Sequence, residues 1–208
     1  MCENCVNIAC ITDTWLKETI PCQHVNIPGY NSHRSNWKDG RRGGGVAVFV
    51  RNSLPCVRLS ALENANVETV WLLYRRPRMP HTISHVVVGA VYHPPARDGS
   101  VMLTHIFDCL DTVTHDHPYA RVVLVGDFNK MRDAMLMSYP LKQVVRPSTH
   151  GSAILNKIYT NISDWGLIGM SVLSSCRISV SRITMQSWWC LCTRRHRGER
   201  TWRDVGCT

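Results

Sequence analysis

The sequence predicts an α/β fold, and three observations support this class. The apolar residues Val122–Val125 form an unbroken run, which is typical of a strand buried on both faces. Another apolar run, Ile83–Val91, comes before it and predicts a second strand. Between the two runs, a helical spacing links Met102, Leu103, Ile106, Leu110 and Val113. Strand, helix and strand therefore follow one another here.

Before residue 83, apolar runs bounded by turn residues predict mostly strands. The expected strands are Val6–Thr12, Val46–Val50, and the pair Val57–Leu62 and Val67–Tyr74 around the turn 63–66. Residues 33–45 hold four lysines or arginines and three consecutive glycines. We expect a positive, mobile loop there, which either lets a phosphate approach the backbone or is simply solvated.

The helix is expected to begin at Ser100 as its N-cap and to end before Pro118. Beyond the strand at 122–125, Tyr139–Val145 is a weak element and 146–151 is a polar loop. Ala153–Asn161 alternates well enough to predict one more strand. Its two faces carry Leu155, Lys157 and Tyr159 on one side and Asn156 and Ile158 on the other.

The composition fits one globular domain. A chain of 208 residues with 44% apolar content can build a sizeable core. It has no run of about 18 apolar residues and no signal-peptide pattern, so we expect a protein that is neither secreted nor in a membrane. The ten cysteines lack zinc-site spacing, which favours free thiols.

The formal net charge of +9 suits a polyanionic partner such as nucleic acid. The charge is unevenly spread, because the residues from 166 onward hold seven arginines and two acidic residues. About half of the excess therefore belongs to a segment without clear periodicity.

Polar residues follow three of the predicted strands. Asp127 and Asn129 come directly after residues 122–125, where α/β folds place their sites. In an extended chain both point to the same side, so one could hold a cation or polarise a water while the other orients a phosphate oxygen. The alternative is an Asx-turn.

Asp13 and Tyr92 also follow strands, and each has two interpretations. Asp13 is either a metal or substrate ligand or the N-cap of a short turn through 16–18. Tyr92 either donates its hydroxyl to a phosphate or is a buried tyrosine bonded to backbone.

Five motifs occur in order over residues 6 to 165: Thr-Asp-Thr-Trp-Leu, Gly-Gly-Gly-Val-Ala-Val-Phe-Val, Val-Tyr-His-Pro-Pro, Gly-Asp-Phe-Asn and Ile-Tyr-Thr-Asn. Together they resemble the endonuclease/exonuclease/phosphatase family, and most of all the endonuclease domain of non-LTR (LINE-type) retrotransposon polyproteins. The resemblance implies a four-layer, DNase I-like α/β sandwich of two β-sheets flanked by helices, incomplete at both ends. It also implies DNA nicking with Mg²⁺ or Mn²⁺ that primes reverse transcription.

The resemblance also implies roles for single residues. Asp13 stands where the family has a metal-binding glutamate, and Tyr92 matches the tyrosine that contacts the scissile phosphate. Asp127 matches the aspartate that orients the attacking water, and we count it as a second metal ligand; Asn129 matches the neighbouring asparagine. The expected partner is DNA, the expected state is a monomer without an obligate protein partner, and the expected location is the nucleus.

Four departures from the family predict an impaired or inactive enzyme. The family's first strand and first helix would precede Val6, so we expect an exposed sheet edge. Asp13 is one methylene shorter than glutamate, although Mg²⁺ demands near-ideal geometry. Asn156 stands where the family usually has aspartate. The closing Ser-Asp-His motif, with its catalytic histidine, does not occur in the chain.

The missing motif divides the chain into a partial endonuclease domain, 1–165, and an Arg-, Cys- and Trp-rich tail, 166–208. Ser181–Trp189 can be encoded by TCT CGG ATC ACG ATG CAG TCG TGG TGG. Read from its third base, this DNA gives Ser-Asp-His-Asp-Ala-Val-Val-Val. A frameshift between Trp165 and Ser174 would therefore explain the tail, and the alternative is natural divergence.

Three alternatives to a nicking enzyme stay open. One is a catalytically silent nucleic-acid-binding remnant that grips phosphates with Arg34, Lys38, Arg41 and Arg42. Another is a chain that does not fold stably. The third, an enzyme of the same fold that acts on small phosphates, is disfavoured by the retroelement-like motifs.

Overall fold

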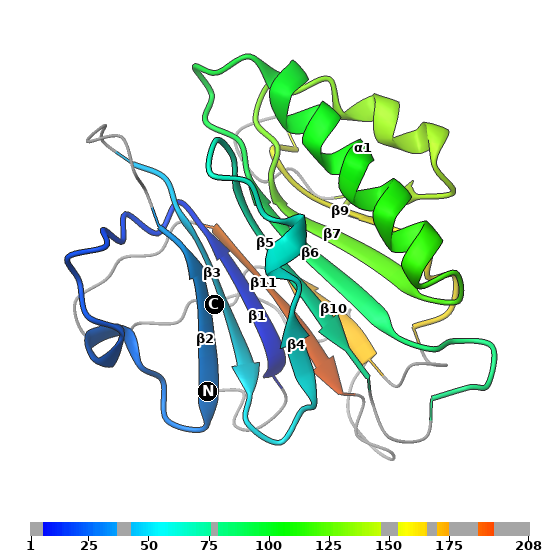
Figure 1. Cartoon of the computed structure of the whole chain (residues 1–208), viewed down its shortest axis with the longest axis horizontal. Helices are drawn as coiled ribbons and strands as arrows, with labels where there is room; N and C mark the ends of the chain where they lie inside the picture. Colours follow the sequence, from blue (N-terminus) through cyan, green and yellow to red (C-terminus); the bar gives the residue numbers. More distant parts are fainter. Residues whose placement is uncertain are drawn as a thin grey trace.

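The computed structural model of the chain describes residues 6–36, 43–75, 79–146 and 154–165, and the backbone of 170–174 and 187–193. These residues form two β-sheets, and helix α1 (Gly99–Asp116) packs on the outer face of one of them (Figure 1). The α/β class and the DNase I-like arrangement of two packed sheets are confirmed. Helices are few among the described residues, and the outer face of the other, five-stranded sheet is covered by irregular chain and a short 3-10 helix rather than by an α-helix.

The first sheet has five strands in the order β10-β11-β1-β3-β2, all antiparallel. Their bounds are β1 Val6–Thr12, β2 Tyr30–Ser35, β3 Val46–Arg51, β10 Met170–Ser174 and β11 Ser187–Thr193. β11 pairs with β1 on the side opposite β3, so β1 lies inside the sheet and its described edge strands are β10 and β2.

The second sheet has six strands in the order β4-β5-β6-β7-β9-β8. Their bounds are β4 Cys56–Arg58, β5 Glu68–Tyr74, β6 Val86–Tyr92, β7 Arg121–Asp127, β8 Lys142–Gln143 and β9 Asn156–Thr160. β6 and β7 are parallel, and α1 is the crossover between them, as the strand–helix–strand pattern predicted. The carboxyl ends of β6 and β7 therefore meet at the same edge of the sheet.

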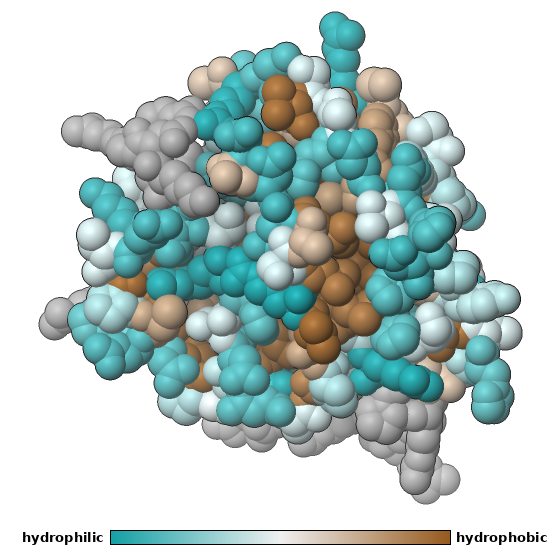
Figure 2. Space-filling view, viewed as in Figure 1, coloured by the Kyte–Doolittle hydropathy of each residue, from teal (hydrophilic) through white to brown (hydrophobic). Residues whose placement is uncertain are grey.

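Three apolar layers hold these elements together. Alternate residues of both sheets, such as Ile8 and Val48 in one and Val88 and Val125 in the other, fill the space between the sheets. The opposite face of the second sheet, with Leu124, packs against α1. A smaller cluster covers the outer face of the first sheet. In the view of Figure 2, which is that of Figure 1, hydrophobic residues lie near the middle of the visible surface and hydrophilic ones lie around them.

The structure corrects three predicted elements. Residues 33–35 belong to β2 rather than to a loop. Of the expected strand 57–62, only Val57 and Arg58 pair with β5 as part of β4, and Ser60–Leu62 forms the 3-10 helix η2. The N-cap of α1 is Asp98, whose side chain accepts a hydrogen bond from the Ser100 amide. Asp98 can replace Ser100 as the N-cap because a carboxylate accepts the helix N–H groups at least as well as a hydroxyl.

The remaining described elements are the short 3-10 helices η1 (Cys22–Val25) and η3 (Asp133–Ser138). In the described part of the chain, no helix combines the length and apolar character that crossing a membrane requires. The four cysteines whose side chains are described, Cys10, Cys22, Cys56 and Cys109, are free thiols.

Candidate functional site

Four polar side chains lie side by side at one end of the six-stranded sheet. Glu68 opens β5 and pairs with Tyr92 at the end of β6. Tyr92 pairs with Asp127 at the end of β7, and Asp127 pairs with Asn156 at the start of β9. Directly opposed residues point to the same face of a sheet, and Tyr92 belongs to the core between the sheets. The row therefore faces the first sheet.

The turn after β7 fixes Asp127 and Asn129. The Asn129 amide N–H donates to Oδ1 of Asp127 at 3.1 Å, and Asn129 has a φ of 43°. The Asx-turn is therefore present, and the extended geometry that would align both side chains is wrong. Nδ2 of Asn129 donates to the His93 carbonyl at 2.8 Å, and the His93 N–H donates to the Asp127 carbonyl at 2.9 Å. These bonds connect the residues that directly follow β6 with those at the end of β7.

Asp13 reaches the row from the first sheet, directly after β1. Its backbone has a left-handed φ of 55°, and no helix begins there, so the N-cap alternative is wrong. Oδ1 of Asp13 accepts the amide N–H of Gly44 at 2.7 Å. The carbonyl of Gly44 in turn accepts the N–H of Trp15 at 2.8 Å.

The glycine segment 43–45 lies between the two sheets at this end. Gly43, Gly44 and Gly45 have φ values of 94°, 120° and 91°, which other residues rarely adopt. The N–H of Gly45 donates to Oε2 of Glu68 at 2.5 Å. For this loop, approach to a phosphate and simple solvation were both left open, and two of its amides donate to carboxylates.

Tyr92 is buried among acidic groups. Burial raises the pKa of its hydroxyl, and the charge of Asp13, a hydrogen bond to Asp13, and the charges of Asp127 and Glu68 raise that pKa further. The hydroxyl is thus protonated at neutral pH and is a hydrogen-bond donor. Its partner is Asp13, so the backbone-bonded alternative does not describe this tyrosine.

The donor chemistry around Tyr92 fits Mg²⁺ in one respect. Asp13 and Asp127 offer hard carboxylate oxygens, and Mg²⁺ is commonly held by one or two carboxylates together with waters and substrate phosphates. Among the described residues, no group of three or more His, Cys, Asp or Glu side chains is placed to hold a metal.

A pocket of about 440 Å³ adjoins the row. Glu68 and His93 line it together with Arg97, and Val67 and Met102 give it an apolar wall. Burial lowers the pKa of His93, so its imidazole is neutral at neutral pH. The pocket is thus a mainly apolar hollow with polar groups near the row.

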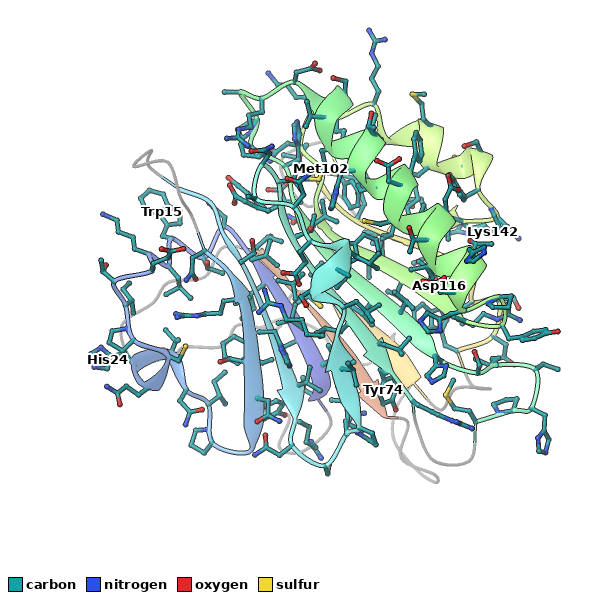
Figure 3. All side chains as sticks on the ribbon, in the orientation of Figure 1. Trp15, His24, Tyr74, Met102, Asp116 and Lys142 are labelled. Carbon is teal, nitrogen blue, oxygen red and sulfur yellow. The ribbon has the colours of Figure 1, made fainter. Side chains whose placement is uncertain are left out.

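Labelled residues show where this end lies in the molecule. In Figure 3, Trp15 and Met102 lie toward the same end of the two sheets, whereas Tyr74 and Asp116 lie toward the other. Tyr74 ends β5, which begins with Glu68, and Asp116 ends α1. Asp116 is therefore remote from the row.

Of the four basic residues expected to bind phosphates, the structure describes only Arg34. Nη2 of Arg34 donates to the Ile20 carbonyl and to Sγ of Cys22, each at 3.2 Å, so this arginine also anchors the chain outside β2. Lys38, Arg41 and Arg42 lie outside the described residues. The nucleic-acid role of all four stays a prediction.

The structure brings Asp13, Tyr92, Asp127, Asn129 and Asn156 to one end, as the motifs suggested. Sequence reasoning missed Glu68. The available signal was weak: an acidic residue opens an apolar strand, and it would have been found only by aligning that strand with the end of β6. The catalytic and metal roles of these residues stay predictions.

Comparisons with known proteins agree with this geometry. The family model described as the endonuclease/exonuclease/phosphatase family matches residues 7–203. No curated protein matches the chain. The match covers nearly the whole chain, including most of the tail.

Solved structures share the fold at low identity. The endonuclease domain of TRAS1, a telomere-specific non-LTR retrotransposon, has a TM-score of 0.53 and 14% identity, covering 81% of this chain and 80% of that one. Truncated TDP2 from Caenorhabditis elegans has a TM-score of 0.55 and 12% identity, covering 90% and 84%. D. rerio TDP2 complexed with a single-strand DNA product has a TM-score of 0.53 and 10% identity, covering 90% and 85%. These likenesses show the fold.

Proposed function

The chain belongs to the endonuclease/exonuclease/phosphatase family, and from this premise we propose that it is a retrotransposon-type endonuclease that nicks DNA with Mg²⁺ or Mn²⁺. The single observation that supports this best is the row of Tyr92, Asp127 and Asn156 facing Asp13. Similarity to the retrotransposon endonuclease fold supports the same choice.

Each side chain has a task in this proposal. Asp127 orients the attacking water and accepts its proton, and the Asx-turn keeps its carboxylate in one orientation. Tyr92, as a neutral phenol, donates to a non-bridging oxygen of the scissile phosphate. Asn129 donates a hydrogen bond to the carbonyl of His93, the residue directly after β6, and so fixes the distance between Tyr92 and Asp127. A bound Mg²⁺, held by Asp13 and Asp127, would supply water activation and offset phosphate charge.

We propose that the rate is low in this chain. One carboxylate oxygen of Asp13 already accepts the Gly44 amide N–H, and the Asp13 side chain is shorter than the family glutamate. Asn156 adds no charge to the row. A histidine acid or base contributes typically about 10²–10⁴-fold, and the Ser-Asp-His motif that carries it does not occur.

The test is nicking of supercoiled plasmid with Mg²⁺, with and without EDTA. We expect slow, EDTA-sensitive nicking that Asp127→Ala reduces by about 10²-fold or more. Asp116→Ala is the matched control, because it removes an exposed carboxylate at the remote end of α1. Nicking that both variants retain would mean that the row is not the active site.

The silent binder is the second candidate, and the basic net charge of the chain favours it. It predicts salt-sensitive plasmid binding that Asp127→Ala leaves unchanged, with no nicking at any metal concentration. Nicking that Asp127→Ala abolishes would exclude this candidate.

A further inference from the structure

Glu68 has no assigned role, yet it occupies one corner of the candidate site. The carboxylate is buried, with the residue 8% exposed, and a buried carboxylate is retained only where something compensates its desolvation. One partner is the Gly45 amide. Such a charge-assisted bond to a backbone N–H is stronger than a neutral one.

The Gly45 bond joins the two sheets. Gly45 directly precedes β3 of the first sheet, and Glu68 opens β5 of the second. A second link crosses the same opening, because the Tyr92 hydroxyl at the end of β6 bonds to Asp13 after β1. The Gly44 amide then connects the two links by donating to Asp13. The contacts form a closed ring: Glu68, Gly45, Gly44, Asp13, Tyr92 and, by strand pairing, Glu68 again.

Asp13 depends on this ring for its orientation. Its own backbone is in the left-handed region, where a non-glycine residue persists only if its surroundings hold it. The glycine segment has no side chains to anchor it and has unusual φ values at three consecutive positions. The amides of Gly44 and Gly45 are held by Asp13 and Glu68, whereas their carbonyls accept the N–H groups of Trp15 and Thr14.

We propose that Glu68 is a positioning residue, which fixes the Gly43–Gly45 segment through the Gly45 amide and thereby orients the Asp13 carboxylate toward the bound cation. The cation step rests on the proposed function, whereas the holding of the glycine segment does not. Glu68 acts through Gly45 and Gly44 in this account and does not itself bind the cation.

Two measurements on the whole chain test the proposal: hydrogen exchange of the Gly44 and Gly45 amides, and Mn²⁺ binding followed by electron paramagnetic resonance. Glu68→Ala removes the acceptor, so we expect exchange at both amides to be about tenfold faster and Mn²⁺ binding about tenfold weaker, the effect of one lost hydrogen bond. Glu68→Gln keeps an acceptor oxygen without the charge. It should stay within about threefold of the parent in both measurements.

Glu68→Asp keeps the charge and is the second variant if the alanine variant fails to fold. Its shorter side chain retreats from Gly45, so exchange at that amide should accelerate as in Glu68→Ala. Glu18→Ala removes an exposed acid near β1 and is the control for a general charge effect. It should change neither measurement.

Two outcomes would overturn the proposal. Unchanged Gly45 exchange in both Glu68→Ala and Glu68→Asp would show that the carboxylate does not hold the segment. Weakened Mn²⁺ binding in Glu68→Gln with a protected Gly45 amide would make Glu68 a direct ligand. If no variant binds Mn²⁺ but exchange responds as expected, the proposed metal-dependent function fails and the positioning of the glycine segment stands.

Discussion

At the scale of single residues, backbone geometry builds the site as much as side-chain chemistry does. Gly126 precedes Asp127 with a φ of 153°, and a Cβ there would lie 1.8 Å from the Val91 carbonyl oxygen. The parallel pair β6–β7 can close at the site end only because this residue has no side chain. The motif Gly-Asp-Phe-Asn therefore needs its glycine for packing and its aspartate for chemistry.

Gly126→Ala should destabilise the protein by more than about 3 kcal/mol, because the new methyl group overlaps backbone atoms that cannot move without breaking the β6–β7 pairing. The measurement is urea unfolding of the variant and the parent. Gly29→Ala is the matched control: Gly29 has a φ of +85° but open space around its Cβ position. It should cost only about 1–2 kcal/mol, and equal losses in both variants would contradict the overlap.

Cysteine reactivity gives a second prediction at this scale. Burial raises the pKa of Cys10 and of Cys109 to about 12, the charge of a neighbouring group adding to each, and burial raises the pKa of Cys56 to about 11. A raised pKa leaves less thiolate at pH 8, and the thiolate is the nucleophile. Of these four described cysteines, iodoacetamide should therefore label exposed Cys22 first, Cys56 later, and Cys10 and Cys109 last, as mass spectrometry would show. Early labelling of Cys10 would contradict its place between the sheets.

At the scale of elements, the strand that carries Asn156 is anchored by an ion pair. Nζ of Lys157 lies 2.5 Å from Oδ2 of Asp133 in η3, and the two side chains are 18% and 8% exposed. The bond fixes β9 against η3 on the face opposite the row. It thereby helps to hold Asn156 beside Asp127.

Asp133→Ala should cost about 3 kcal/mol or more, because it leaves the Lys157 ammonium in a poorly hydrated place without its partner. Thermal and urea unfolding measure this loss. Asp116→Ala breaks the pair of Asp116 with His115, whose side chains are 55% and 88% exposed, and should change stability by less than about 1 kcal/mol. A double variant, Asp133→Ala with Lys157→Met, should recover part of the loss, and no recovery would contradict the buried-charge explanation.

Elements with strong periodicity could be predicted from the sequence, and those set by distant partners could not. β1, β3, β5, β6, β7, β9 and α1 follow from apolar patterns. β2 is half-buried and rich in polar residues, so its sequence predicted a loop. Its strand conformation comes from pairing with β3, which the sequence pattern does not reveal. Most of the candidate site could also be predicted, because Asp13, Tyr92 and Asp127 lie at the ends of predicted strands. The place of Glu68 in the site could not be predicted from the sequence. It depends on the register of β5 against β6 and on a hydrogen bond from the Gly45 amide, which directly precedes β3 of the other sheet.

At the scale of the whole molecule, the tail completes the first sheet. β11 pairs with β1, and β10 pairs with β11. Both strands belong to residues 166–208, which we assigned to the tail. Antiparallel pairing sets Ser187, the first residue of β11, opposite Thr12, which directly precedes Asp13. The chain therefore enters this strand at the site end of the molecule.

This placement sharpens the proposal that the tail is read out of frame. In the alternative frame, valines stand at the positions of Ser187 and Trp188, and a histidine stands four residues before Ser187. Valine suits a strand, and four residues span at most about 14 Å, so that histidine could reach the end of β1 that carries Asp13.

The genomic DNA and the transcript across the codons for Trp165 to Cys190 decide whether the frame proposal is right. We expect a second frame that encodes Ser-Asp-His there, and a chain restored to that frame should nick plasmid about 10²-fold faster or more, because it regains a histidine acid or base. The control is the restored chain with that histidine changed to alanine, which should return to the slow rate while it keeps the folded stability of the restored chain. If no such frame exists, Ser187–Thr193 is the chain's own strand, and Asp127 and Asn129 need a catalytic partner other than that histidine.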